Sequence, residues 1–396
     1  MTPLRHNREY VALWVGNAVS SLGISISSFA FPLVVLGATG STVKAGLVGS
    51  VLTATTFFLR LPAGAFVDRV DRKRLMIVCD AGRALGSASL AVALALGHFY
   101  LAHVLVVAFF EGLLGTLFGP AESAAVRRVV APEQRREAVA RNQSRQQIPG
   151  VIGPPLGGVL LSASRALPFA ADAISYLSSL VAILFVRTPL RDPVIEEHEE
   201  MRGIFDGIRW LWARPFLRAL LCWMSAGTIA FGGIGLVILV YARHEGASSS
   251  QLGLMFAITA AGSVAGALAT PRLMRSLSPR VIVTGALWAV ALAMSLLLAV
   301  RSPYLVGLLG AFSVFFVPAL GSLLFAAIAA EAPDSLQGRT TAGAIQISNL
   351  PAPIAPLLAG VLLGGLGVRH TVLLYAVFLL LLAAGATVSR GLRATS

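Results

Sequence analysis

The sequence predicts an all-α membrane protein in which twelve transmembrane helices form two pseudo-symmetric bundles of six. Three observations lead to this prediction. The chain has 396 residues, of which 56% are hydrophobic and 12% are charged, whereas an average soluble domain has about 25% charged residues. Its apolar segments are about 20 residues long, which is the length that a helix needs to cross the hydrocarbon core. A proline- and glycine-rich segment of the first half also recurs in the second half.

The predicted spans are separated at charged residues, prolines and glycines. Their centres lie near Ser21, Ala54, Gly86, Leu113, Gly153, Leu177, Ile229, Ser263, Leu292, Phe316, Pro351 and Leu379. The first apolar segment is too long for the core of a signal peptide, so we expect it to remain as the first span. We expect an N-terminal bundle over 1–187, a cytoplasmic linker over 188–214 and a C-terminal bundle over 215–396.

Basic residues gather in alternate loops and predict the orientation of these spans. One side holds Arg5, Arg8 and Arg339, the segments 69–74, 127–141, 187–218 and 272–280, and finally Arg390 and Arg393; the other side holds only Lys44, Arg165, Arg243, Arg301 and Arg369. The positive-inside rule therefore predicts that both termini are cytoplasmic. Because the net charge of +13 is spread over short loop clusters, it does not indicate a nucleic-acid partner. The two cysteines lie in apolar segments and indicate neither a disulfide nor a metal site.

The predicted linker begins with an acidic run and continues into an amphipathic segment. The acidic run contains Glu196, Glu197, Glu199 and Glu200, and suits a solvated linker. The segment IFDGIRWLW then places Ile204, Ile208, Leu211 and Trp212 on one helical face. Such a face is typical of a helix that lies on the membrane surface.

The two halves share a proline pattern. QQIPGVIGPPLGGVLL at 146–161 aligns with SNLPAPIAPLLAGVLL at 348–363, so that Pro149 matches Pro351 and Pro154 matches Pro356. The fifth span then corresponds to the eleventh, which indicates a repeat of six helices. Two parallel halves of six spans are typical of a transporter that exposes a central site to alternate sides of the membrane.

The segment GAFVDRVDRKRL at 64–75 concentrates six charges between the second and third predicted spans. It resembles the signature loop of the major facilitator superfamily, G-x-x-x-D-R-x-x-R-[KR]-[KR]. The matching positions are Gly64, Asp68, Arg69, Arg72, Lys73 and Arg74. Asp71 stands where the family pattern often has glycine. The resemblance implies the facilitator fold and a transport function.

The order of residues in this loop suggests a latch between the two halves. Gly64 would let helices approach closely, and Asp68 would face the positive N-terminal end of a helix near residues 338–341. Arg72 would pair with a carboxylate on the fourth span, for which Glu122 is the candidate. A plain positive-inside anchor would explain the arginines of this loop but not Asp68.

A second resemblance extends over nearly the whole chain. FPLVVLGATGS, FGPAESAAVRRVVAPEQRREA and GIRWLWARPFLRALL are similar to the exporter branch of this superfamily that contains macrolide and enterobactin efflux proteins. GPPLGG, with Gly153, Pro154, Gly157 and Gly158, resembles the span-five signature of its antiporters. Close helix packing through small residues is an alternative explanation for that motif. The resemblance implies multidrug or antibiotic efflux across a bacterial cytoplasmic membrane.

Charged residues inside predicted spans are candidates for ion coupling, because charge within the bilayer is costly. Glu111 is the first candidate, since an apolar cavity would allow it to be protonated; pairing with a buried arginine is the alternative. Asp80 is a second candidate, although it lies one turn from Arg83 and the two would neutralise each other. We expect Asp172 to lie close enough to the outer surface to be solvated or paired. Arg60 and Arg145 are expected to snorkel towards the cytoplasm.

Candidates for the substrate cavity are sparse polar groups and aromatic rings. Asn17, Ser21, Ser25 and Ser28 share one face of the first span, while Trp223, Phe231, Phe312 and Phe316 lie in the seventh and tenth spans. A largely apolar cavity with few polar groups suits bulky amphiphilic substrates. Contacts with lipid or with neighbouring helices are the alternative role of these aromatic side chains.

The sequence therefore favours a proton-coupled exporter of hydrophobic or amphiphilic small molecules. It has no G-x-x-x-x-G-K-[ST] motif, so transport would draw on an ion gradient; one proton crossing about 150 mV releases about 3.5 kcal/mol. A siderophore exporter or a lipid carrier is the alternative within transport, and a sensor or scaffold is the alternative outside it. The absence of H-E-x-x-H and G-x-S-x-G argues against an enzyme. We expect a monomer whose partners are substrate, protons and the lipid bilayer, with no cofactor.

Overall fold

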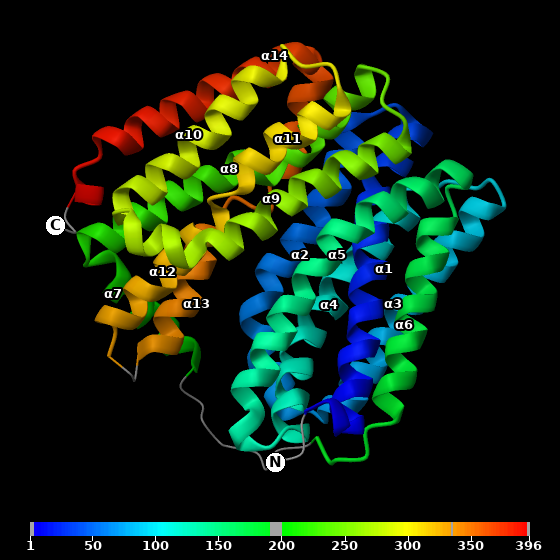
Figure 1. Ribbon diagram of the computed structural model, residues 1–396. Coiled ribbons are helices and arrows are strands. Elements are labelled where there is room, and N and C mark those ends of the chain that lie inside the picture. The colour runs from blue at the N-terminus through cyan, green and yellow to red at the C-terminus, as the bar shows by residue number, and fades with distance from the viewer. Residues whose placement is uncertain (1–3, 191–199, 334–335, 394–396) are drawn as a thin grey trace. The chain divides into compact units, whose positions relative to one another are not determined.

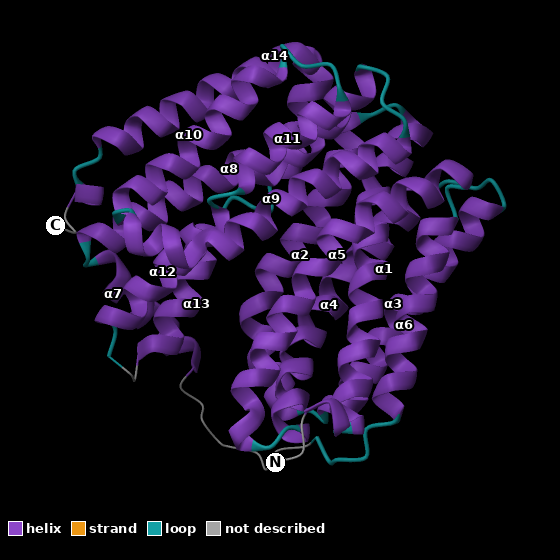
Figure 2. Cartoon of the chain, viewed as in Figure 1, coloured by secondary structure: helices purple, strands orange, loops and turns teal. Residues whose placement is uncertain are grey.

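The computed structural model describes residues 4–190, 200–333 and 336–393, and these ranges contain helices and loops but no strand (Figure 2). Ten helical segments of the described residues are long and apolar enough to cross a membrane, and one of them, Pro303–Glu331, consists of two consecutive helices. Contacts divide the chain into two compact units. One unit contains α1 to α6, and the other contains α7, α8, most of α9 and α10 to α14 (Figure 1).

The first unit is a bundle of six helices joined by short loops. Its helices are α1 (Arg8–Thr39), α2 (Thr42–Arg69), α3 (Arg72–Ala95), α4 (Leu101–Val129), α5 (Arg135–Ala163) and α6 (Leu167–Leu184). The side chains of Asn7, Ser41 and Asp71 accept hydrogen bonds from backbone N–H groups in the first turns of α1, α2 and α3. These residue types are favoured at helix starts because they satisfy otherwise unpaired N–H groups. The loop between α1 and α2 turns at Gly40, whose φ of 65° is the left-handed conformation that suits glycine.

The second unit contains the remaining helices. They are α7 (Glu200–Trp212), α8 (Pro215–His244), α9 (Ser249–Ser276), α10 (Pro279–Leu297), α11 (Pro303–Val314), α12 (Val317–Glu331), α13 (Gln337–Ser348) and α14 (Ala355–Val388). Proline is the first residue of α8, α10 and α11. This position suits proline because the first N–H groups of a helix have no partner within it.

The helices account for twelve spans although only ten qualify by length and composition. The eleventh is α5, whose N-terminal half is charged and which contains three prolines. The twelfth arises because α14 breaks at Gly367, where φ is 76°. The part of α14 before Gly367 continues α13 as one span, and the part after it is the last span. The fold class predicted from the sequence is confirmed.

The two copies of the proline repeat fold differently. In the first copy, α5 runs without interruption through Pro149 and Pro154. In the second copy, α13 ends at Ser348 and α14 begins at Ala355, so the helix is interrupted around Pro351. The second copy has an additional proline at 353, where the first has Val151. The second copy therefore breaks where prolines stand at 351 and 353, whereas α5 continues through the adjacent Pro154 and Pro155 of the first copy.

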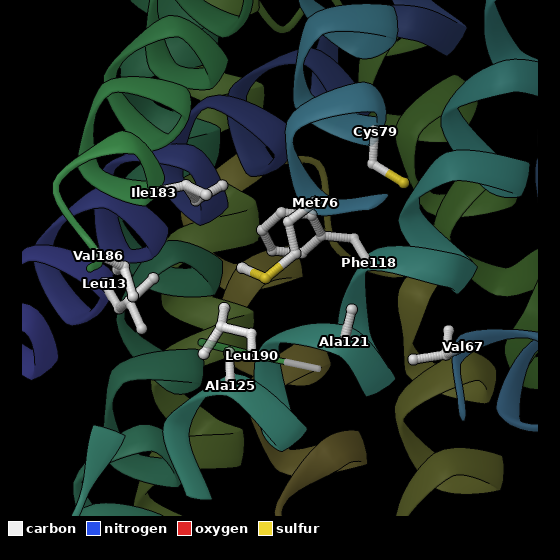
Figure 3. Close-up of a cluster of buried hydrophobic side chains, with 10 residues drawn as sticks. All are labelled: Leu13, Val67, Met76, Cys79, Phe118, Ala121, Ala125, Ile183, Val186 and Leu190. Carbon is white, nitrogen blue, oxygen red and sulfur yellow. The ribbon is translucent and has the colours of Figure 1, made fainter. Parts of the chain in front are cut away.

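A core cluster of the first unit holds its helices together near the α2–α3 turn and the chain that follows α6 (Figure 3). It contains Leu13 of α1, Val67 of α2, Met76 and Cys79 of α3, Phe118, Ala121 and Ala125 of α4, Ile183 of α6, and Val186 and Leu190 after α6. Small residues on α4 let Met76 and Phe118 pack closely among their neighbours (Figure 3). Cys79 is a free thiol within this core, while the other cysteine, Cys222, is exposed and also free.

The amphipathic segment of the linker is a helix, and part of its apolar face, at Ile208 and Leu211, packs on protein. A Cβ added at Gly207 of α7 would lie 2.6 Å from the carbonyl oxygen of Arg339, and one added at Gly343 of α13 would lie 3.0 Å from Ile208. Leu211 is fully buried, whereas Trp212 remains 46% exposed. The expectation of a helix lying on the membrane surface is therefore corrected for Ile208 and Leu211, because α13 covers them. The acidic residues Glu196, Glu197 and Glu199 lie outside the described residues.

Candidate functional site

A cavity of about 420 Å³ lies within the first unit, among α1, α2, α3 and α4. Its charged lining residues are Arg60, Arg83 and Glu111, and its hydroxyl groups come from Ser27, Ser28, Thr56 and Thr116. Ile24, Phe31, Leu52 and Pro120 supply apolar walls. The mixture of apolar walls and a few polar groups is typical of a small-molecule site. Of the predicted cavity residues on the first span, only Ser28 lines this cavity.

Glu111 enters the cavity wall from α4 and is held by two hydroxyl groups. The Tyr176 hydroxyl of α6 donates to Glu111 Oε2 over 2.7 Å, and the Ser87 hydroxyl of α3 lies 3.4 Å from Glu111 Oε1. Neither neighbour is charged, and no ion pair with Glu111 occurs among the described residues. Glu111, the first candidate for ion coupling, is therefore hydrogen-bonded to two neutral side chains.

Arg83 lies beside this carboxyl group but pairs with Asp80. The distance from Arg83 Nη2 to Asp80 Oδ1 is 2.6 Å, and both side chains are almost fully buried. The guanidinium carbon lies 4.8 Å from the ring centre of Phe118 and 4.4 Å from that of Tyr176. A cation over an aromatic face is stabilised by the ring quadrupole. Arg83 thus balances Asp80 and also packs against the tyrosine that donates to Glu111.

Asp172 of α6 belongs to the same cluster, which corrects the expectation that it lies near the outer surface. The residue is 0% exposed. Its Oδ2 accepts a hydrogen bond of 2.9 Å from Ser87, the same hydroxyl that lies near Glu111. The sequence placed Asp172 near a predicted span end, and it contained no signal that this side chain turns inward. The pairing depends on the rotation of α6 about its axis, which hydropathy alone does not predict.

A second buried charged group links α4 and α5. Arg145 Nη2 lies 2.6 Å from Glu122 Oε1, and the arginine side chain is 3% exposed. Arg145 Nη1 also lies 3.5 Å from the hydroxyl of Ser21 on α1. The expected snorkelling of Arg145 is corrected, because this side chain turns into the bundle. The expected pairing of Glu122 with Arg72 is corrected as well, since α5 supplies a cation nearer to Glu122.

The signature loop is fastened to its own unit. Arg72 Nη2 lies 3.2 Å from Asp68 Oδ1, and Arg72 Nη1 donates to the carbonyl oxygen of Leu190 over 3.4 Å. Lys73 Nζ donates to the carbonyl oxygen of Val186 over 2.5 Å. The α2–α3 turn is therefore attached to the chain that follows α6.

The remaining loop positions are less enclosed. Asp68 is 65% exposed in its side chain, and Arg69 and Arg74 are exposed. A Cβ added at Gly64 would meet no atom of its unit within 4 Å, so the close approach expected at this glycine does not occur inside the first unit. The predicted partner of Asp68, at residues 338–341, belongs to the other unit, and the latch remains a prediction.

The other polar candidates of the first span make contacts between helices. Asn17 Oδ1 accepts from Ser179 of α6 over 3.3 Å, and Ser21 donates to the carbonyl oxygen of Asn17 over 2.7 Å. Ser25 donates to the carbonyl oxygen of Pro149 on α5 over 2.8 Å. Three of the four polar side chains on this face thus satisfy hydrogen bonds within the bundle.

The span-five motif brings α5 against α1. A Cβ added at Gly153 would collide with Ser25, and one added at Gly157 would lie 3.0 Å from the carbonyl oxygen of Ile26. The motif residues Pro154 and Gly158 lie in the same uninterrupted helix. Close packing is the role that these contacts support for Gly153 and Gly157.

The aromatic candidates lie in the second unit. A Cβ added at Gly385 of α14 would lie 2.8 Å from the Trp223 indole, so this ring packs against a neighbouring helix. Phe316 makes an edge contact of 5.2 Å with Phe315, and Phe312 is 48% exposed. Phe231 is half-buried on α8. A role in substrate binding remains a prediction for these rings.

The described helices define a polytopic membrane protein with ionisable side chains buried among apolar segments. Within the described ranges, no three His, Cys, Asp or Glu side chains are grouped so that they could hold a metal ion. The model of the Major Facilitator Superfamily matches residues 13–341. The chain belongs to this superfamily of membrane transporters.

Similarity to characterised relatives extends over most of the chain. It is 25% identical to the multidrug efflux pump Tap of Mycolicibacterium fortuitum, over 91% of this chain and 90% of that protein. It is 23% identical to the enterobactin exporter EntS of Shigella flexneri, over 93% of this chain and 87% of that protein.

Solved transporter structures share the fold. A bacterial homologue of the human lysosomal transporter Spinster, inward-facing and unoccupied, has a TM-score of 0.74 and 16% identity over 99% of this chain and 98% of that chain. A bacterial homologue of the iron transporter ferroportin, also inward-facing, has a TM-score of 0.69 and 14% identity over 95% and 99% of the two chains.

Proposed function

We propose that this protein is a secondary active efflux transporter that exports hydrophobic or amphiphilic small molecules, such as drugs, antibiotics or secondary metabolites, in exchange for protons. The observation that carries the proposal is similarity to a multidrug efflux pump and to a siderophore exporter over about nine tenths of each chain. Similarity of this extent includes the membrane-spanning elements of both halves, not one motif alone.

The cavity of the first unit supports this class of substrate. Its walls combine Phe31, Leu52 and Ile24 with a small number of hydroxyl groups and with Arg60 and Glu111. An amphiphile can bury its apolar part against such walls while a polar group meets the charged side chains. A sugar would need a denser set of hydrogen-bonding groups.

Glu111 is the proposed coupling residue. It lines the cavity and is held by Tyr176 and Ser87 without an ion-pair partner of its own. Protonation from outside and release inside would couple inward proton flow to outward substrate flow. The ion gradient then supplies the free energy of export.

The proposal also covers the membrane in which the protein lies, its orientation and its oligomeric state. Similarity to bacterial exporters supports placement in a bacterial cytoplasmic membrane. The distribution of arginine supports cytoplasmic termini, and we propose that the protein acts as a monomer. Asp68 would act in the latch of the cytoplasmic side, where its exposed carboxylate is available to a helix N-terminus.

A siderophore exporter is the second candidate, because several of the similar proteins are enterobactin exporters. The two candidates differ in the ligand that is exported. Cells that express the protein are loaded in parallel with a panel of apolar drugs and with iron-free catecholate chelators, and release is followed over time. Export of chelators alone would replace the multidrug proposal.

Glu111→Gln tests the coupling step in proteoliposomes with and without an imposed pH gradient. Glutamine keeps the size and most of the hydrogen bonding but cannot carry the proton. We expect this variant to lose concentrative, gradient-driven transport and to retain downhill exchange. The control is Glu137→Gln, which removes a carboxylate from an exposed pair with Arg141 on α5. If Glu111→Gln still concentrates substrate in response to the gradient, another carboxyl group couples transport, and Asp80 is the next to test.

A further inference from the structure

Asp172 is a buried carboxyl group that the proposed coupling step does not yet use. Its side chain is 0% exposed, and its Oδ1 has no hydrogen-bond partner among the described residues. Its Oδ2 accepts from Ser87, which also lies within 3.4 Å of Glu111. One hydroxyl group thus stands between two carboxyl groups from different helices, α4 and α6.

The Ser87 hydroxyl cannot donate to two ionised carboxylates at once. The Ser87 hydroxyl has a single hydrogen, so it donates to Asp172 or to Glu111 but not to both. The Tyr176 hydroxyl already donates its single hydrogen to Glu111 Oε2. If both carboxyl groups were ionised, one of the Ser87 contacts would set two oxygen lone pairs against each other. A single added proton removes this conflict: Glu111 donates to Ser87, and Ser87 donates to Asp172.

The charges around Glu111 and Asp172 also favour a single proton on this pair of carboxyl groups. The charged and titratable groups around Asp172 are Asp80 and Arg83 on α3, Glu111 on α4 and Tyr176 on α6. On the α1 side, the Ser27 hydroxyl is a neutral hydrogen-bonding neighbour of Asp172, and a Cβ added at Gly23 would lie 2.9 Å from Asp172 Oδ1. The one arginine of the cluster pairs with Asp80. Glu111 and Asp172 then share a buried site without a cation of their own, and two such carboxyl groups do not both ionise.

We propose that Glu111, Ser87 and Asp172 hold one proton in common, with Glu111 as its entry from the cavity and Asp172 as its buried acceptor. In the transfer, the Glu111 Oε1–H bond breaks as a Ser87 O–H bond forms, while the original Ser87 O–H bond breaks as an Asp172 Oδ2–H bond forms. Ser87 remains a neutral hydroxyl, and one proton moves from Glu111 to Asp172. This inference extends the proposed coupling role of Glu111 by a second carboxyl group and a relay.

The test is infrared difference spectroscopy of the purified full-length protein in lipid nanodiscs, titrated with pH in H₂O and in D₂O. The carbonyl band of a protonated carboxylic acid reports the shared proton directly and shifts on deuteration. We expect Asp172→Asn to abolish the band of the shared proton. Ser87→Ala is expected to shift that band and its titration, because the bridging hydrogen bond is lost. Ser89→Ala, an exposed serine on the same helix, is the matched control and should leave the band unchanged.

Two results would overturn the proposal. One is a band that survives unchanged in Asp172→Asn; the other is a spectrum of Ser87→Ala identical to that of Ser89→Ala. Because Ser87→Ala removes only one oxygen atom, it keeps the test decisive if Asp172→Asn fails to fold. The readout needs no substrate, so a protein that shows the shared proton but no proton-driven export would contradict the proposed function and leave this inference standing.

Discussion

Apart from Arg72, which pairs with Asp68, the buried charged side chains described in the first unit form two groups, and single substitutions should distinguish the roles of these groups. The first group joins Asp80, Arg83, Glu111 and Asp172 next to the cavity. The second joins Glu122 to Arg145 and, through Arg145, reaches Ser21. We assign the first to proton coupling and the second to holding α1, α4 and α5 together.

Glu122→Gln should destabilise the protein strongly. It would leave the guanidinium of Arg145 buried without a counter-charge, and breaking a buried ion pair from one side costs about 3–5 kcal/mol. The melting temperature of the purified protein measures this loss. Glu137→Gln disrupts an ion pair within α5, the helix that carries Arg145; the two side chains of this pair are about half exposed, and such pairs contribute little. Equal melting temperatures for the two variants would contradict the role given to Glu122.

Asp68→Asn should slow transport while leaving expression and membrane insertion near normal. The carboxylate is mostly exposed within its own unit, so its loss removes little packing. Its proposed contact with a helix N-terminus contributes about 0.3–2 kcal/mol. Turnover in reconstituted vesicles is the measurement. Asp71→Asn is the matched control, because it removes the same charge from the same loop and asparagine still caps α3. Unchanged turnover in Asp68→Asn would exclude a role for Asp68 in the transport cycle.

At the level of helices, α7, which lies in the predicted linker, packs against other helices of the second unit. Gly207 brings α7 against the backbone of Arg339 in α13. Beyond α7, the guanidinium of Arg214 lies 3.3 Å from the ring centre of Trp210 and pairs with Glu331 over 2.9 Å. We infer that α7 follows the second unit and does not act as a free tether.

Gly207→Ala should loosen this attachment. The added methyl group would lie 2.6 Å from a backbone oxygen, and overpacking of this kind costs about 1–3 kcal/mol. Limited proteolysis of the segment 188–214 and the melting temperature both report the change. Gly338→Ala on α13 is the control, because a Cβ there meets no atom within 4 Å and alanine favours a helix. Faster cleavage of Gly207→Ala than of Gly338→Ala is expected; equal cleavage would contradict the packing argument.

At the scale of the whole molecule, the orientation in the membrane can be tested along one helix. With 28 residues, α9 is about 40 Å long, which is enough to cross the bilayer. Its ends carry Ser250 and Ser276, both exposed. The arginine distribution predicts that Ser250 faces outside and Ser276 faces the cytoplasm.

Cysteine substitutions at Ser250 and Ser276 should therefore be labelled by impermeant reagents from opposite sides. Intact cells expose the first, and inverted vesicles expose the second. The exposed Cys222 is first replaced by alanine, while Cys79 is buried and stays. Labelling of Ser250→Cys only from the cytoplasmic side would overturn the predicted topology.

The sequence by itself predicted the transmembrane helices and the superfamily, because both depend on patterns of neighbouring residues. Apolar runs of bilayer length predict the helices, and the loop motif at Gly64–Arg74 together with longer similar stretches indicates the superfamily that the family model confirms. These properties follow from segments of consecutive residues, each of which meets lipid or water largely independently of the others.

Only the tertiary structure decided which buried side chains meet. In the structure, Ser87 links Asp172 to Glu111. Glu122 pairs with Arg145 and not with Arg72. The helix α13 covers Ile208 and Leu211 of α7. Such pairings depend on the rotation and depth of each helix relative to its neighbours. Packing along the whole length of the helices determines this rotation and this depth. Successive residues of a helix are about 100° apart around its axis, so a small rotation of the helix moves a side chain from the lipid to the core while the mean hydropathy of the segment stays the same.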